Sequence, residues 1–211
     1  MLRTGCRAFV AFAGGLDIPL VMGSRSTDMK AKIGGYQGRK LQKDDVIAFR
    51  APKTDLKNLG VRHISPEFVP RAEYKLRVVL GPQDDAFTEK GLFDFKSALY
   101  TVTQDSNRMA AKLSGAPIEA KAGVDILSDG IVEGSVQVSA NGQPIVMLAD
   151  HQSTGGYAKI ATVIPCDIPA LAQVRPGQLV GFRVVSVEEG AEACRKEKEK
   201  WTYLKEAIDH D

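Results

Sequence analysis

Two stretches of this chain carry the same landmarks in the same order, and such a duplication restricts the possible folds more than any local signal does. Residues 5–27 (GCRAFVAFAGGLDIPLVMGSRST) align with residues 134–154 (GSVQVSANGQPIVMLADHQST), with small gaps at the turn. Each copy predicts a strand, a Gly-containing turn and a second strand that ends in Ser-Thr. The landmarks that follow in both copies are a Gly-Gly-Tyr triplet and a turn-plus-strand ending, at 34–36 and 41–50 in the first copy and at 155–157 and 174–183 in the second. The sequence therefore predicts two related β-rich lobes.

The two copies are not equally complete. Residues 74–133 precede the repeated hairpin in the second lobe, whereas only residues 1–4 precede it in the first. We therefore expect the first lobe to lack its opening strands and to expose strand edges, which a partner or a second copy of the chain would cover. The expected division is a partial first lobe over 1–50, an extended Pro-containing connection over 51–73, a second lobe over 74–187 and a C-terminal helix over 188–211.

Local patterns support this division. Alternating apolar residues predict a strand over 74–80, and cap residues such as Thr88 predict a short helix over 88–97, although Gly91 weakens that pattern. Near the C-terminus, apolar residues at helical spacing predict a helix that packs on the second lobe. The residues of this stripe are Cys194, Trp201, Leu204 and Ile208.

Composition excludes several classes of protein. Lys+Arg number 28 and Asp+Glu 26, and the resulting formal net charge of +2 creates too weak a field to attract nucleic acid or an anionic membrane. No stretch approaches the ~18 apolar residues of a membrane span. The three cysteines lack paired C-x-x-C spacing and are typical of free thiols in a reducing compartment, so we expect a cytoplasmic protein. The scattered histidines and the absence of an H-E-x-x-H motif predict no metal site.

The segment 150–159 (DHQSTGGYAK) is the densest collection of functional groups in the chain. Its paired glycines let backbone N–H groups approach a ligand, and its lysine is suited to a carboxylate or phosphate. The segment taken alone slightly favours a simpler interpretation, a Gly-Gly turn between strands 145–149 and 160–164 with solvated polar side chains. It does not fit a P-loop. Its adjacent acid, imidazole and hydroxyl would point to alternate faces of a strand, so they predict no serine-hydrolase triad.

Two further groups of residues are candidates for binding. In the first copy, Arg25 and Arg39 carry guanidinium groups suited to bidentate carboxylate recognition, and Ser26 and Thr27 lie beside Arg25. The alternative is an exposed turn with its arginines in solvent. Arg108 either reaches a cleft or lies in a turn, and the sequence favours neither interpretation.

Several of these segments together resemble one family. They are LADHQSTGGYAKIATVI (148–164), EGSVQVSANGQPI (133–145), SNRMAAKLSG (106–115), LAQVRPGQLV (171–180), GGLDIPLVMGSRST (14–27) and GGYQGRKL (34–41). In this order they are similar to the biotin-dependent carboxyltransferase family, also called allophanate hydrolase subunit 2, and most of all to those members that are the C subunit of 5-oxoprolinase. The resemblance covers nearly all of residues 5–187. The positions that depart from the family pattern are Asn107, Ala111, His151 and Ala158.

The resemblance implies a mainly β fold of two tandem cyclophilin-like β-barrel lobes, here with an incomplete first lobe and a C-terminal helix. It implies a subunit of an ATP-dependent 5-oxoprolinase, which opens 5-oxoproline to L-glutamate and is not active alone. The alternatives are the carboxyltransferase component of a biotin-dependent urea carboxylase and a regulatory protein that antagonises a histidine-kinase inhibitor. The implied partners are other oxoprolinase or carboxyltransferase subunits and a small cyclic amide or urea-like substrate.

The resemblance also implies the cofactors and residue roles. ATP is expected, bound with a partner subunit, and biotin belongs only to the urea carboxylase alternative. The expected catalytic residues are Asp150, Ser153 and Lys159. The expected substrate-binding residues are Arg25, Ser26, Thr27, Arg39, Arg108, Gln152, Thr154, Gly155, Gly156 and Tyr157.

Overall fold

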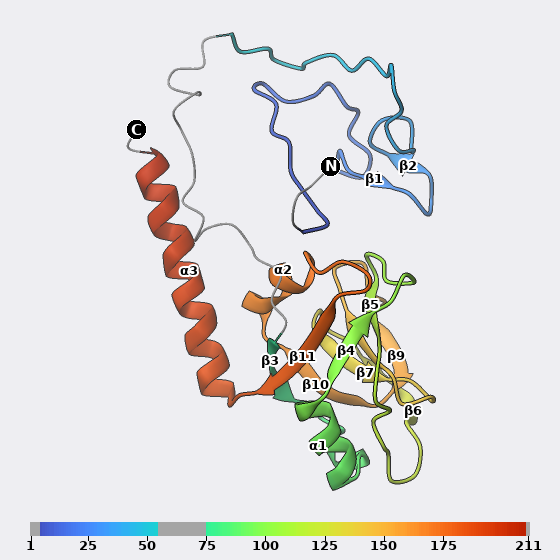
Figure 1. Ribbon diagram of the computed structural model, residues 1–211. Coiled ribbons are helices and arrows are strands. Elements are labelled where there is room, and N and C mark those ends of the chain that lie inside the picture. The colour runs from blue at the N-terminus through green and yellow to red at the C-terminus, as the bar shows by residue number, and fades with distance from the viewer. Residues whose placement is uncertain (1–4, 55–74, 210–211) are drawn as a thin grey trace. The chain divides into compact units, whose positions relative to one another are not determined.

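The computed structural model describes residues 5–54 and 75–209 (Figure 1). The chain divides into two compact units. The described part of one unit comprises residues 8–54, and that of the other comprises residues 75–209 together with residues 5–7. Most of the expected connection over 51–73 lies outside the described residues. None of the helices in the described ranges is both long enough and apolar enough to cross a membrane.

The larger unit contains a closed barrel of seven strands, in which the strand order is β10-β3-β11-β4-β5-β8-β7 and β10 pairs again with β7. The strands are β3 (Lys75–Leu80), β4 (Leu99–Val102), β5 (Ala110–Ser114), β7 (Ser135–Val138), β8 (Pro144–Met147), β10 (Lys159–Val163) and β11 (Leu179–Val184). All neighbouring strands are antiparallel except β3 and β11, which run parallel. The barrel confirms the expected β-rich second lobe.

Apolar side chains from the barrel strands, from two helices and from connecting segments fill the core. Phe95 and Phe182 stack with ring centroids 4.5 Å apart, and Tyr100 lies tilted against Phe182 at 5.9 Å. Such pairs combine a large buried area with favourable ring geometry. The repeated hairpin of the second copy supplies Val136 and Val146, which are both fully buried. The hairpin is therefore part of the barrel wall.

The helix α1 (Glu89–Ser97) forms where the cap residues predict it. The Thr88 hydroxyl accepts a hydrogen bond from the Gly91 N–H at 3.0 Å, which satisfies one of the free donors at the helix start. Gly91, which weakened the sequence prediction, has a packing role. A Cβ at this position would lie 2.2 Å from the carbonyl oxygen of Glu119, so only glycine lets the helix approach that segment.

The helix α3 (Val187–Asp209) follows β11 as a single long helix (Figure 1). It begins with a capping box, because the Ser186 hydroxyl accepts from the Glu189 N–H at 3.1 Å while the Glu189 carboxylate accepts from the Ser186 N–H at 2.9 Å. The expected packing of its apolar stripe is wrong beyond Cys194. Trp201 and Ile208 remain 40% and 50% exposed, since only the first turns of α3 lie against the barrel.

The remaining elements are short. A separate two-stranded sheet pairs β6 (Asp125–Gly130) with β9 (Thr154–Tyr157). Between β10 and β11 lie the 3₁₀ helix η3 (Pro165–Asp167) and α2 (Ile168–Leu171), and η2 (Asp84–Ala86) precedes α1. This arrangement corrects the Gly-Gly turn expected between 145–149 and 160–164. Gly155 and Gly156 lie inside strand β9, and the chain turns before them.

In the smaller unit, residues 8–54 form only the two-residue strands β1 (Thr27–Asp28) and β2 (Ile33–Gly34). The hairpin expected over 5–27 is wrong for the described residues, where only isolated bridges such as Val21 to Ser24 occur. The matching tetrapeptides PLVM (19–22) and PIVM (144–147) differ in burial, and an apolar strand is stable only where its side chains are buried. Met147 of the second copy is 4% exposed in the barrel, whereas Met22 of the first is 95% exposed. Within the described residues the structure therefore shows one barrel and no second one.

Candidate functional site

The segment 150–159 crosses three environments in the larger unit. Asp150 and His151 lie in the turn after β8, and Gln152, Ser153 and Thr154 are exposed as the chain enters β9. Strand β9 then pairs with β6, and Ala158 and Lys159 are buried where β10 begins. The exposed groups at the start of β9 are therefore available to a ligand, whereas those at its end belong to the interior.

Arg108 and Asp150 form an exposed bidentate ion pair. The guanidinium donates from Nε to Oδ2 at 2.7 Å and from Nη2 to Oδ1 at 3.0 Å, and the Asp150 N–H donates to the Arg108 carbonyl oxygen at 3.0 Å. The hydrogen bond from Arg108 holds the pKa of Asp150 below its usual range. The two side chains are 74% and 50% exposed. The structure thus joins one expected binding residue to one expected catalytic residue.

Lys159 is in the opposite situation, because the residue is only 5% exposed. Its ammonium group donates to a carboxylate oxygen of Asp129 and, at 2.9 Å, to the carbonyl oxygen of Gly130. The hydrogen bond from Lys159 lowers the pKa of Asp129, whose side chain is 53% exposed. Since Gly130 pairs with Thr154, the buried lysine fixes the end of β6 beside the start of β9.

Gln137 is a buried residue that the sequence analysis missed. It is 2% exposed, and its amide Nε2 donates to the carbonyl oxygen of Tyr157 at 3.1 Å. A Cβ on Gly155 would lie 2.9 Å from this Nε2 and 2.5 Å from Cδ1 of Ile131. Gly155 is therefore required for the close packing of β9 on the barrel. The signal in the sequence was an amide within the apolar strand SVQVS.

The expected binding residues of the first copy belong to the smaller unit. Arg39 donates to both carboxylate oxygens of Asp45 at 2.8 Å, and these hydrogen bonds lower the pKa of Asp45 to about 2. Arg25 donates from Nε to the carbonyl oxygen of Ile18 at 3.0 Å. The expected binding residues Ser26 and Thr27 follow it, the first exposed and the second half-buried at the start of β1.

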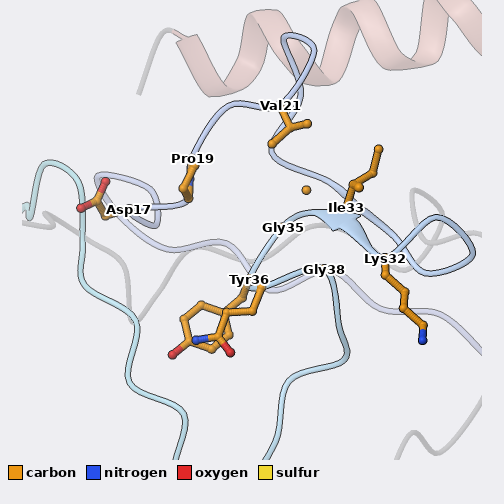
Figure 2. Close-up of a pocket in the computed structure, with 10 residues that line it drawn as sticks. Asp17, Pro19, Val21, Lys32, Ile33, Gly35, Tyr36 and Gly38 are labelled. Carbon is orange, nitrogen blue, oxygen red and sulfur yellow. The ribbon is translucent and has the colours of Figure 1, made fainter.

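A shallow hollow of about 560 Å³ lies beside these residues in the smaller unit (Figure 2). The Gly34–Gly38 loop lines it, with Asp17, Pro19, Val21, Lys32 and Ile33. Figure 2 shows Val21 and Ile33 on one side of the loop and Tyr36 on the other. Gly35 has a φ of +55°, and a Cβ there would overlap the Thr27 hydroxyl. The Gly-Gly-Tyr triplet thus passes from the end of β2 into a turn in the first copy, whereas it lies within strand β9 in the second.

The described residues contain no cluster of three or more His, Cys, Asp or Glu side chains that could hold a metal ion. With the geometry of both candidate regions defined, comparison with known proteins identifies the family. The model of the carboxyltransferase domain, subdomains A and B, matches residues 1–184. The chain belongs to this family.

Relatives in the carboxyltransferase family include two bacterial proteins, each of them the C subunit of a 5-oxoprolinase. The Escherichia coli protein is 36% identical over 198 residues, which is 93% of this chain and 62% of the E. coli protein. The Haemophilus influenzae protein is 34% identical over 207 residues, 98% of this chain and 65% of that protein. The chain thus spans less than two thirds of the length of these relatives.

The crystal structure of the Kluyveromyces lactis urea amidolyase superposes on 94% of this chain with a TM-score of 0.76 and 25% identity. The matched region is 13% of the length of that much larger protein. The carboxyltransferase-family fold is therefore shared between this chain and a small part of a multidomain enzyme.

ATP, which the resemblance to the 5-oxoprolinase relatives implies, does not fit the 155–159 region. Gly155 packs against its own barrel, so its backbone is not a cradle for a phosphate. The Lys159 ammonium group is buried between Asp129 and the Gly130 carbonyl, where no phosphate has access.

Proposed function

We propose that this chain is a subunit of an ATP-dependent 5-oxoprolinase, which opens 5-oxoproline to L-glutamate. The observation that carries the proposal is the 36% identity to the C subunit of the E. coli 5-oxoprolinase, which extends over 93% of the chain. The exposed polar groups at the start of β9 agree with a small cyclic amide as substrate. The proposal assigns part of the substrate site to this chain and the remainder to its partners.

Arg108 is the proposed partner of the substrate carboxylate. Exposed ion pairs contribute only ~0–1 kcal/mol, so a substrate carboxylate can replace Asp150 on the Arg108 guanidinium at little cost. Lys159 offers no such exchange, because its ammonium group is buried. An arginine also binds a carboxylate through two parallel hydrogen bonds, which fixes the orientation of the ring.

The lactam amide of the substrate is then placed beside Gln152, Ser153 and Thr154. Their amide and hydroxyl groups are exposed and can donate hydrogen bonds to the oxygen on which negative charge develops. Asp150, released from Arg108, is a carboxylate at neutral pH and can accept a proton. Lys159 takes a positioning role in this proposal, since it holds β6 beside Thr154 without reaching the surface.

The other proposed binding groups are less accessible. Gly156 and Tyr157 are half-buried in β9, and Tyr157 pairs with Asp125 of β6. Arg39 is held by Asp45. Arg25, Ser26 and Thr27 belong to the smaller unit and remain binding candidates of that unit taken by itself. ATP is assigned to a partner subunit, because the residues at 155–159 do not suit its phosphates.

The apolar surface of residues 8–54 also supports the proposal of partner subunits. Phe9, Val10 and Met22 are 100%, 75% and 95% exposed, and Ile18 is the one large apolar side chain in 8–54 that is buried. Large exposed apolar surfaces of this kind mark protein interfaces. We propose that another polypeptide adds strands to this unit, as β10 and β5 do for the matching hairpin in the barrel.

A second candidate is the carboxyltransferase component of a biotin-dependent urea carboxylase. The superposition on the K. lactis urea amidolyase, with a TM-score of 0.76, favours it. In that case a biotin carrier and a biotin carboxylase would deliver the carboxyl group. The exposed Arg108 would then bind a urea-like substrate or its carboxylated form.

The test is 5-oxoproline-dependent ADP release by the complex of this chain with its partner subunits. Arg108→Gln should raise the KM for 5-oxoproline at least tenfold, and Ser153→Ala should lower kcat with little change in KM. Ser139→Ala, which removes a hydroxyl bonded to the Gln143 carbonyl at the hairpin turn, is the matched control. Unchanged kinetics in both site variants would refute the site, and turnover of urea in place of 5-oxoproline would select the second candidate.

A further inference from the structure

Cys166 and Cys194 bring their sulfur atoms to 3.2 Å, although 27 residues separate them in sequence. Cys166 lies in η3 and Cys194 in α3, so the pair joins the end of the barrel to the C-terminal helix. Both residues are partly exposed, and both are free thiols. The sequence alone gave no reason to pair them.

The surroundings of Cys166 hold its sulfur in place. Asp167 is 8% exposed and accepts from the backbone N–H of Arg77 at 2.7 Å and from its Nε at 3.0 Å. The same guanidinium lies with Nη2 3.6 Å from the Cys166 sulfur. η3 is thus fixed to strand β3, and the position of Cys166 does not depend on α3.

Cys194 is positioned by the close approach of α3 to the barrel one turn earlier. A Cβ on Gly190 would lie 3.0 Å from Cγ2 of Ile164, so the helix backbone contacts the barrel there. Residues i and i+4 lie on the same helix face, and Cys194 therefore points to the same side as Gly190. None of the side chains assigned in 195–208 is buried, so Cys194 lies near the end of the part of α3 that packs against the barrel.

We propose that Cys166 and Cys194 form an oxidisable dithiol site, and that peroxide converts it to a disulfide which clamps α3 to the barrel. One sulfur attacks the O–O bond of hydrogen peroxide to give a sulfenic acid and water, and the second sulfur displaces the sulfenic oxygen as a second water. The net change is two thiols and one peroxide to one disulfide and two waters. The sulfurs need to approach by only about 1.2 Å to reach the bonded distance of ~2.0 Å.

Cys166 is protonated in the reduced form of this site. Burial, followed by the hydrogen bond with Cys194, raises the pKa of the Cys166 thiol to about 12. Cys166 is therefore a thiol at neutral pH, so the attack on peroxide is assigned to Cys194, and the Cys166 proton leaves with the sulfenic oxygen as water when the S–S bond forms. Cys6 provides an internal comparison, because it is exposed and its sulfur contacts the carbonyl oxygen of Ala172 instead of another thiol.

The experiment treats the full chain and its Cys6→Ser variant with hydrogen peroxide, and maps the peptides without reduction by mass spectrometry. Both proteins should yield one linked peptide pair containing residues 166 and 194, with a loss of about 2 Da that dithiothreitol reverses. Titratable thiols in Cys6→Ser should fall from two to none. In the oxidised form, tryptic cleavage after Arg195 and Lys196 should slow at least threefold, because opening of this helix end is restrained.

Two variants distinguish disulfide formation between Cys166 and Cys194 from non-specific oxidation of thiols. Cys166→Ser and Cys194→Ser should each keep the reduced fold by circular dichroism, form no intramolecular link, and lose the protection from trypsin. Sulfinic acid at residue 166 or 194 without a link, a link that includes Cys6, or a disulfide-bonded dimer of the wild-type chain would each overturn the proposal. So would a 166–194 link that leaves the tryptic cleavage rate unchanged.

Discussion

Lys159→Ala tests whether the buried lysine stabilises the barrel mainly through its stem. The substitution removes three methylene groups from a residue that is 5% exposed, at ~0.8 kcal/mol each. It also leaves the Gly130 carbonyl oxygen without the donor that lies 2.9 Å away, which costs a further ~1 kcal/mol. We therefore expect the free energy of unfolding to fall by about 3 kcal/mol.

Lys159→Met separates the two contributions, because methionine keeps an unbranched apolar stem and loses only the charged group. Its expected cost is about 1 kcal/mol, since the half-exposed Asp129 carboxylate is hydrated by solvent when the ammonium group is gone. Lys112→Ala is the control, a lysine in strand β5 whose side chain is exposed, with an expected change within about 0.5 kcal/mol.

The assay is urea unfolding at pH 7 followed by far-ultraviolet circular dichroism, with the change read from the midpoint at constant m. Lys159→Ala as stable as Lys112→Ala would show that the stem is not packed as described. Equal destabilisation by Lys159→Ala and Lys159→Met would show that the ammonium group, and not the stem, carries the stability. Either result would refute the reasoning.

Three further predictions concern single contacts. Gly155→Ala should destabilise the protein by about 1–3 kcal/mol through overpacking, whereas Gly130→Ala, where an added Cβ meets nothing within 4 Å, should be neutral; equal urea midpoints would contradict this. Phe95→Ala should cost about 3–5 kcal/mol, because its ring is fully buried and stacked at 4.5 Å, and a smaller shift in the urea midpoint would contradict the core described. The Asp45 carboxyl carbon should titrate in NMR at a pKa of about 2, and Arg39→Gln should return that pKa toward ~3.9. A depressed folded pKa means that the stability from this pair is present above pH ~4 and is lost as pH falls through about 2, so an unshifted wild-type titration would contradict it.

The sequence predicted those elements whose signals are local. The cap at Thr88 marked α1, and the alternation over 74–80 marked β3, because a side-chain cap and a period of two are properties of adjacent residues. The duplicated hairpin was harder, since its second copy folds into the barrel while the described residues of its first copy form no hairpin. Val146 is buried in a barrel to which β3 and β5 contribute, whereas Val21 has no such strands among the described residues.

The candidate site was predicted only in part, for a related reason. Residue types singled out the groups at 150–154 and Arg108, but they did not predict that Arg108 pairs with Asp150. The partner of Lys159 was not, because Asp129 lies 30 residues away and meets it only through the register of β6 on β9. Two residues that were expected to act on the substrate have a packing role in the structure. They are Lys159, expected to be catalytic, and Gly155, expected to bind substrate.

The central claim is that this chain supplies part of a 5-oxoproline site within a complex, and reconstitution tests it most directly. The partner subunits are purified without this chain, and ADP release is measured with 5-oxoproline and ATP before and after the chain is added back. The account predicts negligible 5-oxoproline-dependent release without the chain, its restoration by wild-type protein, and a raised KM for 5-oxoproline with Arg108→Gln. Full activity in the absence of the chain would contradict the claim.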